Sequence, residues 1–103
     1  MFNIVLVTCP NLKEAEKIAA ELVRLKLAAC VSIIENIKSI YRWKGKIEQS
    51  KELLLIIKTK KSMVPKLIKK VRSLHSYEVP EIIAVPVTRG NSDYLEWIND
   101  SVR

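Results

Sequence analysis

Three side chains in this sequence are suited to binding a metal ion: His75, the only histidine, and Cys9 and Cys30, the only cysteines. Thiolates favour soft ions such as Cu(I), and imidazole favours Cu(II). These residues are therefore a candidate copper-binding set, although their spacing does not require one. With one histidine, a single chain can form neither a Ser/His/Asp triad nor a metal site with two histidines. No other nucleophile with a paired base is visible, so we predict no enzymatic activity.

Each candidate ligand also has a structural explanation. His75 stands where a helix is expected to end, and a histidine there interacts favourably with the negative end of the helix dipole. Tyr77 and Glu78 follow in the same short turn, which favours a functional role for the histidine. Cys30 follows two alanines and fits a small buried apolar side chain. Cys9 stands at the exit of a predicted strand, where ligands often approach a sheet, but Pro10 and the cap of the next helix explain its position as well.

The net charge of +7 is unevenly distributed, because one stretch carries only basic charges. Such a surface attracts phosphates and other anions, whereas the simpler interpretation is a solvated helix face. No aromatic-rich motif for stacking on bases is present, so we predict no nucleic-acid partner. The basic residues are Lys58, Lys60, Lys61, Lys66, Lys69, Lys70 and Arg72.

Length and composition predict one domain, residues 1–103, with nearly half its residues apolar. No apolar run approaches the roughly 20 residues of a membrane span, and the first residues are typical of a strand rather than a signal peptide. Two cysteines without metal-finger spacing indicate a reducing compartment. We therefore predict a cytoplasmic protein with no membrane partner.

The apolar spacing predicts alternating strands and helices. Residues 2–8 are rich in Val and Ile, as in a buried strand. Asn11 followed by Glu14 predicts a helix N-cap with a reciprocal acid, and helical spacing continues to about Lys26. Residues 28–43 and 46–59 predict two strands joined by a turn at Lys44–Gly45.

The second half repeats this order. A helix is predicted from about Ser62, with Pro65 in its first turn, and residues 82–87 form a strand. Gly90 and Asn91 end that strand and begin a last helix, whose predicted inward-facing residues are Tyr94, Leu95, Ile98 and Val102.

This order predicts an α+β fold of the ferredoxin-like βαββαβ type with a C-terminal helix. Residues 53–57 are continuously apolar, which predicts a central strand covered on both faces. Pro86 cannot donate a hydrogen bond to a neighbouring strand, so its strand should lie at an edge.

The central hairpin is too long for one small domain. Its second strand would span about 46 Å, so its outer half should project from the body with exposed apolar side chains. We expect another subunit to cover them. Residues 38 and 51 would be paired across a two-residue loop, which sets two lysines opposite each other. A three-residue loop would instead set Lys38 against Glu52 and Arg42 against Glu48.

Three segments resemble the CutA family, the divalent-cation tolerance proteins: residues 39–48 (SIYRWKGKIE), residues 74–82 (LHSYEVPEI) and residues 27–31 (LAACV). The resemblance covers essentially the whole chain. It implies a compact homotrimer in which the long hairpins pair between neighbours, with a trimer interface that contains Ile40, Tyr41, Trp43 and Ile47.

The resemblance also implies a ligand cleft between subunits that contains Tyr41, Glu48, Lys58 and Tyr77, together with His75 and Cys30 as metal ligands. Glu48 and Lys58 are otherwise expected to be ion-paired. Some copper-binding members of the family carry an adjacent histidine pair and a cysteine in the first strand. This chain departs from them, with Leu74 before His75 and Val7 at the cysteine position.

These observations lead to two functional hypotheses. The first is a cytosolic homotrimer that binds copper or another divalent metal ion, has no organic cofactor, and takes part in metal tolerance. The second is a regulatory module that binds a small anion or a protein partner between subunits. It rests on the basic stretch and on the trimeric plan that CutA proteins share with PII signalling proteins.

Overall fold

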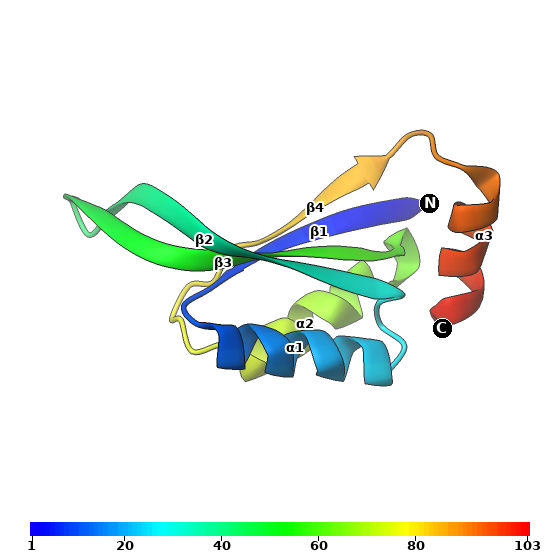
Figure 1. Cartoon of the computed structure of the whole chain (residues 1–103), viewed down its shortest axis with the longest axis horizontal. Coiled ribbons are helices and arrows are strands. Elements are labelled where there is room, and N and C mark those ends of the chain that lie inside the picture. The colour runs from blue at the N-terminus through cyan, green and yellow to red at the C-terminus, as the bar shows by residue number, and fades with distance from the viewer.

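The computed structural model describes residues 1–103 and has the predicted order of elements (Figure 1). The first half contains β1 (Phe2–Cys9), α1 (Leu12–Arg24), β2 (Cys30–Trp43) and β3 (Lys46–Lys60). The second half contains a 3-10 turn (Lys61–Met63), α2 (Val64–Leu74), β4 (Ile82–Val87) and α3 (Ser92–Ser101). The α+β class and the βαββαβ order with a terminal helix are therefore confirmed.

All four strands form one antiparallel sheet in the order β2-β3-β1-β4. β3 lies inside the sheet beside β1, as predicted. β4 lies at the edge of the sheet, where Pro86 is paired with Asn3 of β1. An edge strand tolerates a proline, because only one of its sides bonds to a neighbouring strand.

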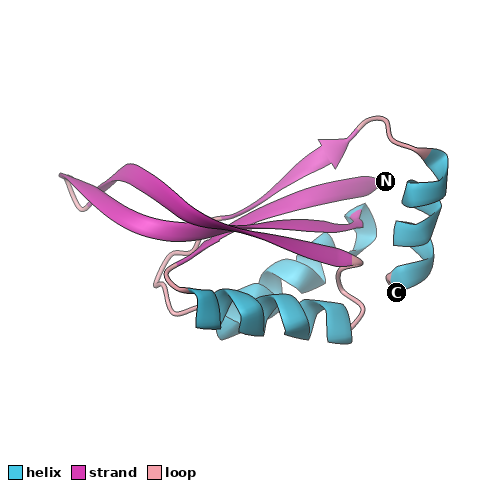
Figure 2. Ribbon diagram, viewed as in Figure 1, coloured by secondary structure: helices cyan, strands magenta, loops and turns pink.

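Helices α1 and α2 pack on one face of the sheet, as Figure 2 shows. Asn11 caps α1, since its side chain accepts a hydrogen bond from the backbone N–H of Glu14. Pro65 lies in the first turn of α2, where its missing N–H is tolerated. The core between the helices and the sheet is fully buried and includes Val5, Val7, Cys9, Ala15, Ile18, Leu22, Leu55, Ile57, Leu67 and Val71.

The opposite face of the sheet is left open within one chain, so the prediction that residues 53–57 are covered on both faces is wrong for the isolated subunit. Leu53, Leu55 and Ile57 are buried under the helices, whereas Leu54 and Ile56 are only half-buried. Side chains alternate along a strand, so Leu54 and Ile56 lie on the open face. We call this surface the open sheet face. Its other members are Ile4, Leu6, Cys30, Ser32, Ile34, Lys58, Ile83 and Val85.

The hairpin of β2 and β3 turns through two residues, Lys44 and Gly45, with φ of 51° and 79°. Positive φ at both central positions matches the twist of the flanking strands. Lys38 is consequently paired with Lys51, and the alternative three-residue loop is wrong. A β-bulge between Ile34 and Ile37 interrupts the ladder.

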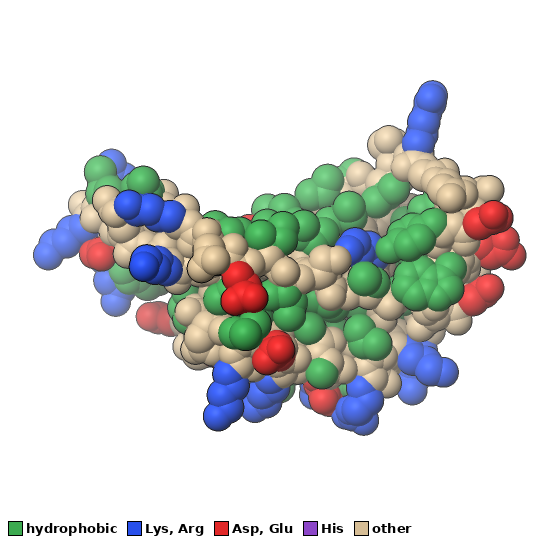
Figure 3. Space-filling view, in the orientation of Figure 1, with side chains coloured by type: hydrophobic (Ala, Val, Ile, Leu, Met, Phe, Trp, Pro, Cys, Tyr) green, Lys and Arg blue, Asp and Glu red, His purple; other side chains and the backbone are tan.

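The outer half of the hairpin projects from the body (Figure 1), and the molecule measures 44 × 25 × 23 Å. Its apolar side chains are exposed as predicted: Ile40 by 64%, Ile47 by 67%, and Tyr41 and Trp43 by about two fifths. Hydrophobic side chains are also visible across the middle of the molecule in Figure 3.

Helix α3 lies beside the end of the sheet that contains the N-terminus (Figure 1) and contacts β3. Ile98 and Val102 are buried as predicted, and Leu95 is half-buried. Tyr94 is exposed, contrary to the prediction, and its ring packs against that of Trp97, which is also exposed, at a centroid distance of 5.4 Å.

Candidate metal site and adjoining pocket

The side chain of His75 is completely buried at the end of α2. Its backbone N–H donates to the carbonyl of Val71 and closes the helix, as predicted for a capping residue. Its ring turns toward β1, where Nε2 lies 2.7 Å from the carbonyl oxygen of Thr8. The backbone N–H of Tyr77 donates to Nδ1 at 3.1 Å. Because Nδ1 accepts this bond, Nε2 carries the proton and donates it to Thr8.

Two further side chains that could hold a metal ion, Cys9 and Glu14, lie beside the ring of His75. The ligand atoms of these three residues all lie within 4.8 Å of one another. Oε2 of Glu14 is 3.3 Å from Nδ1 of His75 and accepts a hydrogen bond from the backbone N–H of Ser76. Glu14 therefore reaches across to the end of α2, and its expected role as the reciprocal acid of the α1 cap is wrong.

Cys9 is fully buried at the end of β1. Burial, together with the nearby carboxylates of Glu14 and Glu52, raises the pKa of its thiol to about 12. Without a cation, this thiol is therefore protonated at neutral pH. A bound metal ion would reverse the balance, because the carboxylates that oppose a thiolate attract a cation, and a coordinated thiol loses its proton.

These residues fit a soft or borderline metal ion. Sulfur, imidazole nitrogen and one carboxylate oxygen are ligands used for zinc and copper. A ligating histidine usually donates its other ring N–H to a carbonyl or carboxylate, which fixes the tautomer. His75 already donates Nε2–H to Thr8, which leaves Nδ1 unprotonated beside the carboxylate of Glu14.

Cys30 does not join this cluster. It is paired with Lys58 on the open sheet face, and its sulfur lies 3.7 Å from Nζ of Lys58. Cys9 lies on the helix side of the sheet, with His75 beside it. Cys9 is the last residue of β1, whereas Lys58 lies opposite Ile4, near the start of β1. The predicted combination of His75 with Cys30 is therefore not formed within one chain, because the sheet separates the two side chains.

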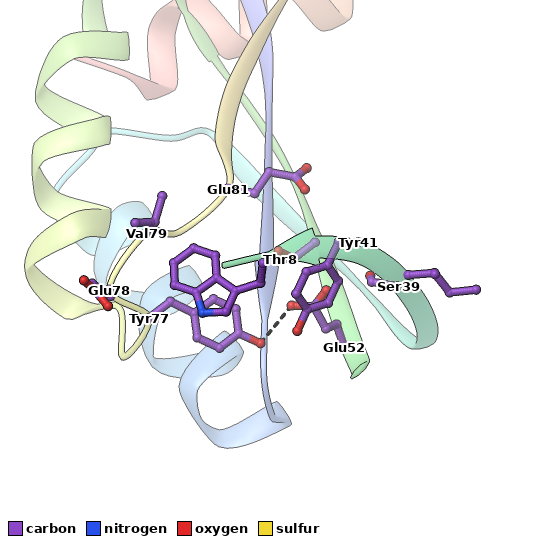
Figure 4. A pocket seen from close by; sticks show the side chains of 10 residues that line it. Thr8, Ser39, Tyr41, Glu52, Tyr77, Glu78, Val79 and Glu81 are labelled. Atoms are coloured by element: carbon purple, nitrogen blue, oxygen red, sulfur yellow. Dashed lines mark hydrogen bonds between the residues drawn. The ribbon is translucent and has the colours of Figure 1, made fainter. Parts of the chain in front are cut away.

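A pocket of about 600 Å³ adjoins the cluster, between the hairpin and the turn after α2 (Figure 4). Tyr77 crosses it and donates its hydroxyl proton to Oε2 of Glu52 at 2.8 Å. Burial and this hydrogen bond raise the pKa of Tyr77 well above its ordinary value, so the proton stays on the phenol. The pocket has aromatic and acidic lining residues and no basic one: Tyr41, Trp43, Tyr77, Glu52, Glu78 and Glu81.

The predicted cleft residues are only partly brought together. Tyr41 and Tyr77 both line the pocket, but Glu48 and Lys58 do not. Glu48 is paired with Tyr41 near the hairpin tip, whereas Lys58 is paired with Cys30 at the other end of β3, about 33 Å away at the rise of a strand. The expected ion pair of Glu48 with Lys58 is thus impossible within one chain, and a cleft between subunits remains a prediction.

Sequence reasoning missed Glu14 and Glu52 as site residues and placed Cys9 second to Cys30. Glu14 has a clear capping signal, which concealed its contact with His75. Glu52 carries one usable signal, a charged residue directly before the apolar run that forms the inner half of β3.

Residues 3–101 match the model of the family described as CutA1 divalent ion tolerance protein. The mouse protein named Protein CutA is 56% identical over 93 residues, which is 90% of this chain and 52% of the mouse protein. The chain thus spans about half the length of this relative.

Solved structures give the same result over whole chains. The divalent cation tolerance protein of Thermus thermophilus is 45% identical, with a TM-score of 0.98 and full coverage of both chains. The Archaeoglobus fulgidus protein, described as a periplasmic divalent cation tolerance protein, is 43% identical with a TM-score of 0.97, also with full coverage of both.

Proposed function

Because this chain belongs to the CutA1 divalent ion tolerance family, we propose that it is a cytosolic homotrimer that binds divalent or soft metal ions, copper among them, in metal tolerance. The observation that carries the proposal is the cluster of Cys9, Glu14 and His75, whose ligand atoms lie within 4.8 Å of one another. The sequence predicted Cys30 as the ligand that accompanies His75. In this proposal the accompanying ligands are Cys9 and Glu14 instead.

The surrounding backbone prepares the three side chains for an ion. The carbonyl of Thr8 holds the Nε2–H of His75, so the tautomer already suits binding through Nδ1, and an ion there would replace the N–H of Tyr77 as its partner. The N–H of Ser76 holds the carboxylate of Glu14. The ion itself supplies the positive charge that allows Cys9 to bind as a thiolate. The proposal requires binding only and assigns no catalytic step.

The test is a copper titration of the native protein and of His75→Ala, Cys9→Ser and Glu14→Gln, under reducing conditions for Cu(I) and separately with Cu(II). The matched control is Cys30→Ser, which removes the other thiol. We expect each of the three cluster variants to weaken binding at least about tenfold, as loss of even a supporting contact does in metal sites. The control should leave affinity unchanged.

Equal affinity of the native protein and His75→Ala would remove the histidine from the site. Loss of copper binding in Cys30→Ser, with unchanged binding in Cys9→Ser, would show that the metal site contains Cys30 on the open sheet face instead. Thermal unfolding of each variant without metal separates loss of a ligand from loss of the fold.

The homotrimer is supported by the exposed hairpin residues Ile40, Tyr41, Trp43 and Ile47 and by the open sheet face. The cytosolic location is supported by Cys9 and Cys30, which are both free thiols. No helix in this structure is long and apolar enough to cross a bilayer.

A second candidate function is regulation by a small anionic ligand, as in PII-like modules. It is favoured by a basic hollow of about 450 Å³ between α2, the segment after α1 and the last residue, where Lys66, Lys69, Lys70 and Arg103 accompany apolar residues such as Leu27. Thermal-shift screening with nucleotides and organic acids tests it, with Lys66→Gln/Lys70→Gln as the control. A shift with metals and none with any anion would eliminate this candidate.

A further inference from the structure

Two oppositely charged side chains on the same strand, Lys58 and Glu52, each lack a charged partner within the chain. We propose that they form an ion pair between copies: Lys58 of one subunit enters the Tyr77 pocket of the next subunit and binds Glu52 there. The inference rests on the threefold assembly of the proposed function, and it adds which residues complete each contact.

Lys58 lies in an unusual place for a charge. It is half-buried on the open sheet face, among apolar neighbours such as Ile4 and Ile56. Its Nζ contacts only neutral groups, Oγ of Ser32 at 2.6 Å and Sγ of Cys30 at 3.7 Å. An ammonium group removed further from water by a second subunit would need an anion beside it.

Glu52 has the complementary deficiency. It is only 7% exposed, and no cationic side chain pairs with it. Its one hydrogen-bond partner is the neutral hydroxyl of Tyr77, which binds Oε2. The acids Glu78 and Glu81 line the same pocket, so the pocket is negative and walled by aromatic rings. Such a site favours a cation.

Lys58 cannot reach Glu52 of its own chain, so an ion pair of these two residues needs another copy. Both residues point to the same face of β3, but six positions separate them, or about 20 Å along a strand. One patch of the chain therefore carries the donor and a different patch carries the acceptor. A contact between two different patches is head-to-tail, and such contacts close into rings when the rotation allows. A trimer is a ring of this kind.

Apolar surface surrounds both groups and would be buried with them. Ile34, Ile83 and Val85 on the open sheet face are each exposed by about half, and Tyr41 and Trp43 border the pocket. The contact would also bring Lys58 and Cys30 of one subunit next to Tyr41 and Tyr77 of another. It would thereby assemble most of the predicted ligand cleft.

A double-mutant cycle on the full-length protein tests the pair. Glu52→Gln, Lys58→Met and the double variant are compared by the guanidinium midpoint of dissociation and by the mass from light scattering. We expect each single change to lower the midpoint, and the double variant to lose no more than the worse single. The matched control combines Glu48→Gln with Lys58→Met, because Glu48 is an exposed acid on the same face of β3. The effects of Glu48→Gln and Lys58→Met on the midpoint should be additive.

A second measurement tests the ion pair even if a variant assembles poorly. Amine acetylation of the native protein, read by mass spectrometry, should modify Lys58 several-fold more slowly than the exposed Lys51. Glu52→Gln should accelerate modification of Lys58 and leave Lys51 unchanged.

The outcomes separate this inference from the proposed function. Additive effects for Glu52 and Lys58, or coupling of Lys58 to Glu48 instead, in a protein that is still trimeric would overturn the ion pair alone. A monomeric native protein would overturn the assembly itself. Copper binding at Cys9 is measured independently of both.

Discussion

Nε2 of His75 lies 2.7 Å from the carbonyl oxygen of Thr8, so the end of α2 is tied directly to the end of β1. The same ring accepts the N–H of Tyr77 at Nδ1. One side chain therefore fixes the turn that positions both the cluster of Cys9, Glu14 and His75 and the wall of the pocket.

Metal affinity should rise with pH. The pKa of Cys9 is raised to about 12, chiefly by burial, so a proton must leave the thiol when an ion binds. Below that pKa, each pH unit increases the thiolate fraction about tenfold, and apparent affinity should follow by up to the same factor. Zinc titrations at pH 6, 7 and 8 measure the slope. A slope in Cys9→Ser as steep as in the native protein would show that another group releases the proton.

Tyr77→Phe should destabilise the fold by about 1–3 kcal/mol, since it leaves the carboxylate of Glu52 without its donor. It should also change the pH dependence. The pKa of Tyr77 is raised in the folded state, so its stabilising effect is complete below about pH 10 and is lost as pH rises further. Melting curves between pH 8 and 11 should fall less steeply in the variant. Tyr94→Phe, which alters an exposed tyrosine, should match the native curve.

Tyr41→Ser combined with Trp43→Ser should loosen the trimer and lower its melting temperature. Burial of an aromatic side chain contributes roughly 1.5–3 kcal/mol, and threefold symmetry repeats the loss at every interface. Light scattering at micromolar concentration and calorimetry are the measurements, with Lys44→Ser at the same hairpin tip as the control. A native mass near 11.8 kDa, that of one chain, would contradict the prediction.

Gly45→Ala should destabilise the hairpin by about 1–2 kcal/mol, because φ is +79° there and only glycine adopts it without strain. A Cβ at this position would meet no atom within 4 Å, so the backbone alone determines the cost. Lys44→Gly, which relieves a positive φ one residue earlier, should not share the loss. Thermal unfolding of the two variants compares them directly.

The fold was largely predictable because its signals are local. Asn11, Pro65 and Pro86 each restrict the backbone in one way, and the apolar periodicities agree with them. The turn register was harder, since repulsion between Lys38 and Lys51 favours another loop. The backbone twist of the two-residue turn determines the register. The two lysines oppose it only weakly, because exposed charged side chains can turn away from each other into water.

The site was less predictable because its contacts join distant parts of the chain. Cys9 and Glu14 are near each other in sequence, but His75 reaches them only when the ends of β1 and α2 meet. The continuous apolar run of β3 likewise cannot distinguish cover by a helix from cover by a second copy. Half-buried Leu54 and Ile56 show only that this chain leaves one face of β3 uncovered.

The β-bulge between Ile34 and Ile37 changes which residues of β2 point to the open sheet face. Before it, even-numbered residues such as Ile34 share a face with Lys58. After it, odd-numbered residues such as Tyr41 do, since Tyr41 lies opposite Glu48 and Ile37 opposite Glu52. Deleting Asn36 would leave one residue opposite Leu53 and restore a regular ladder, so Tyr41 would stay opposite Glu48 on that face. The bulge thus absorbs one extra residue of β2 without changing the pairs of the hairpin tip.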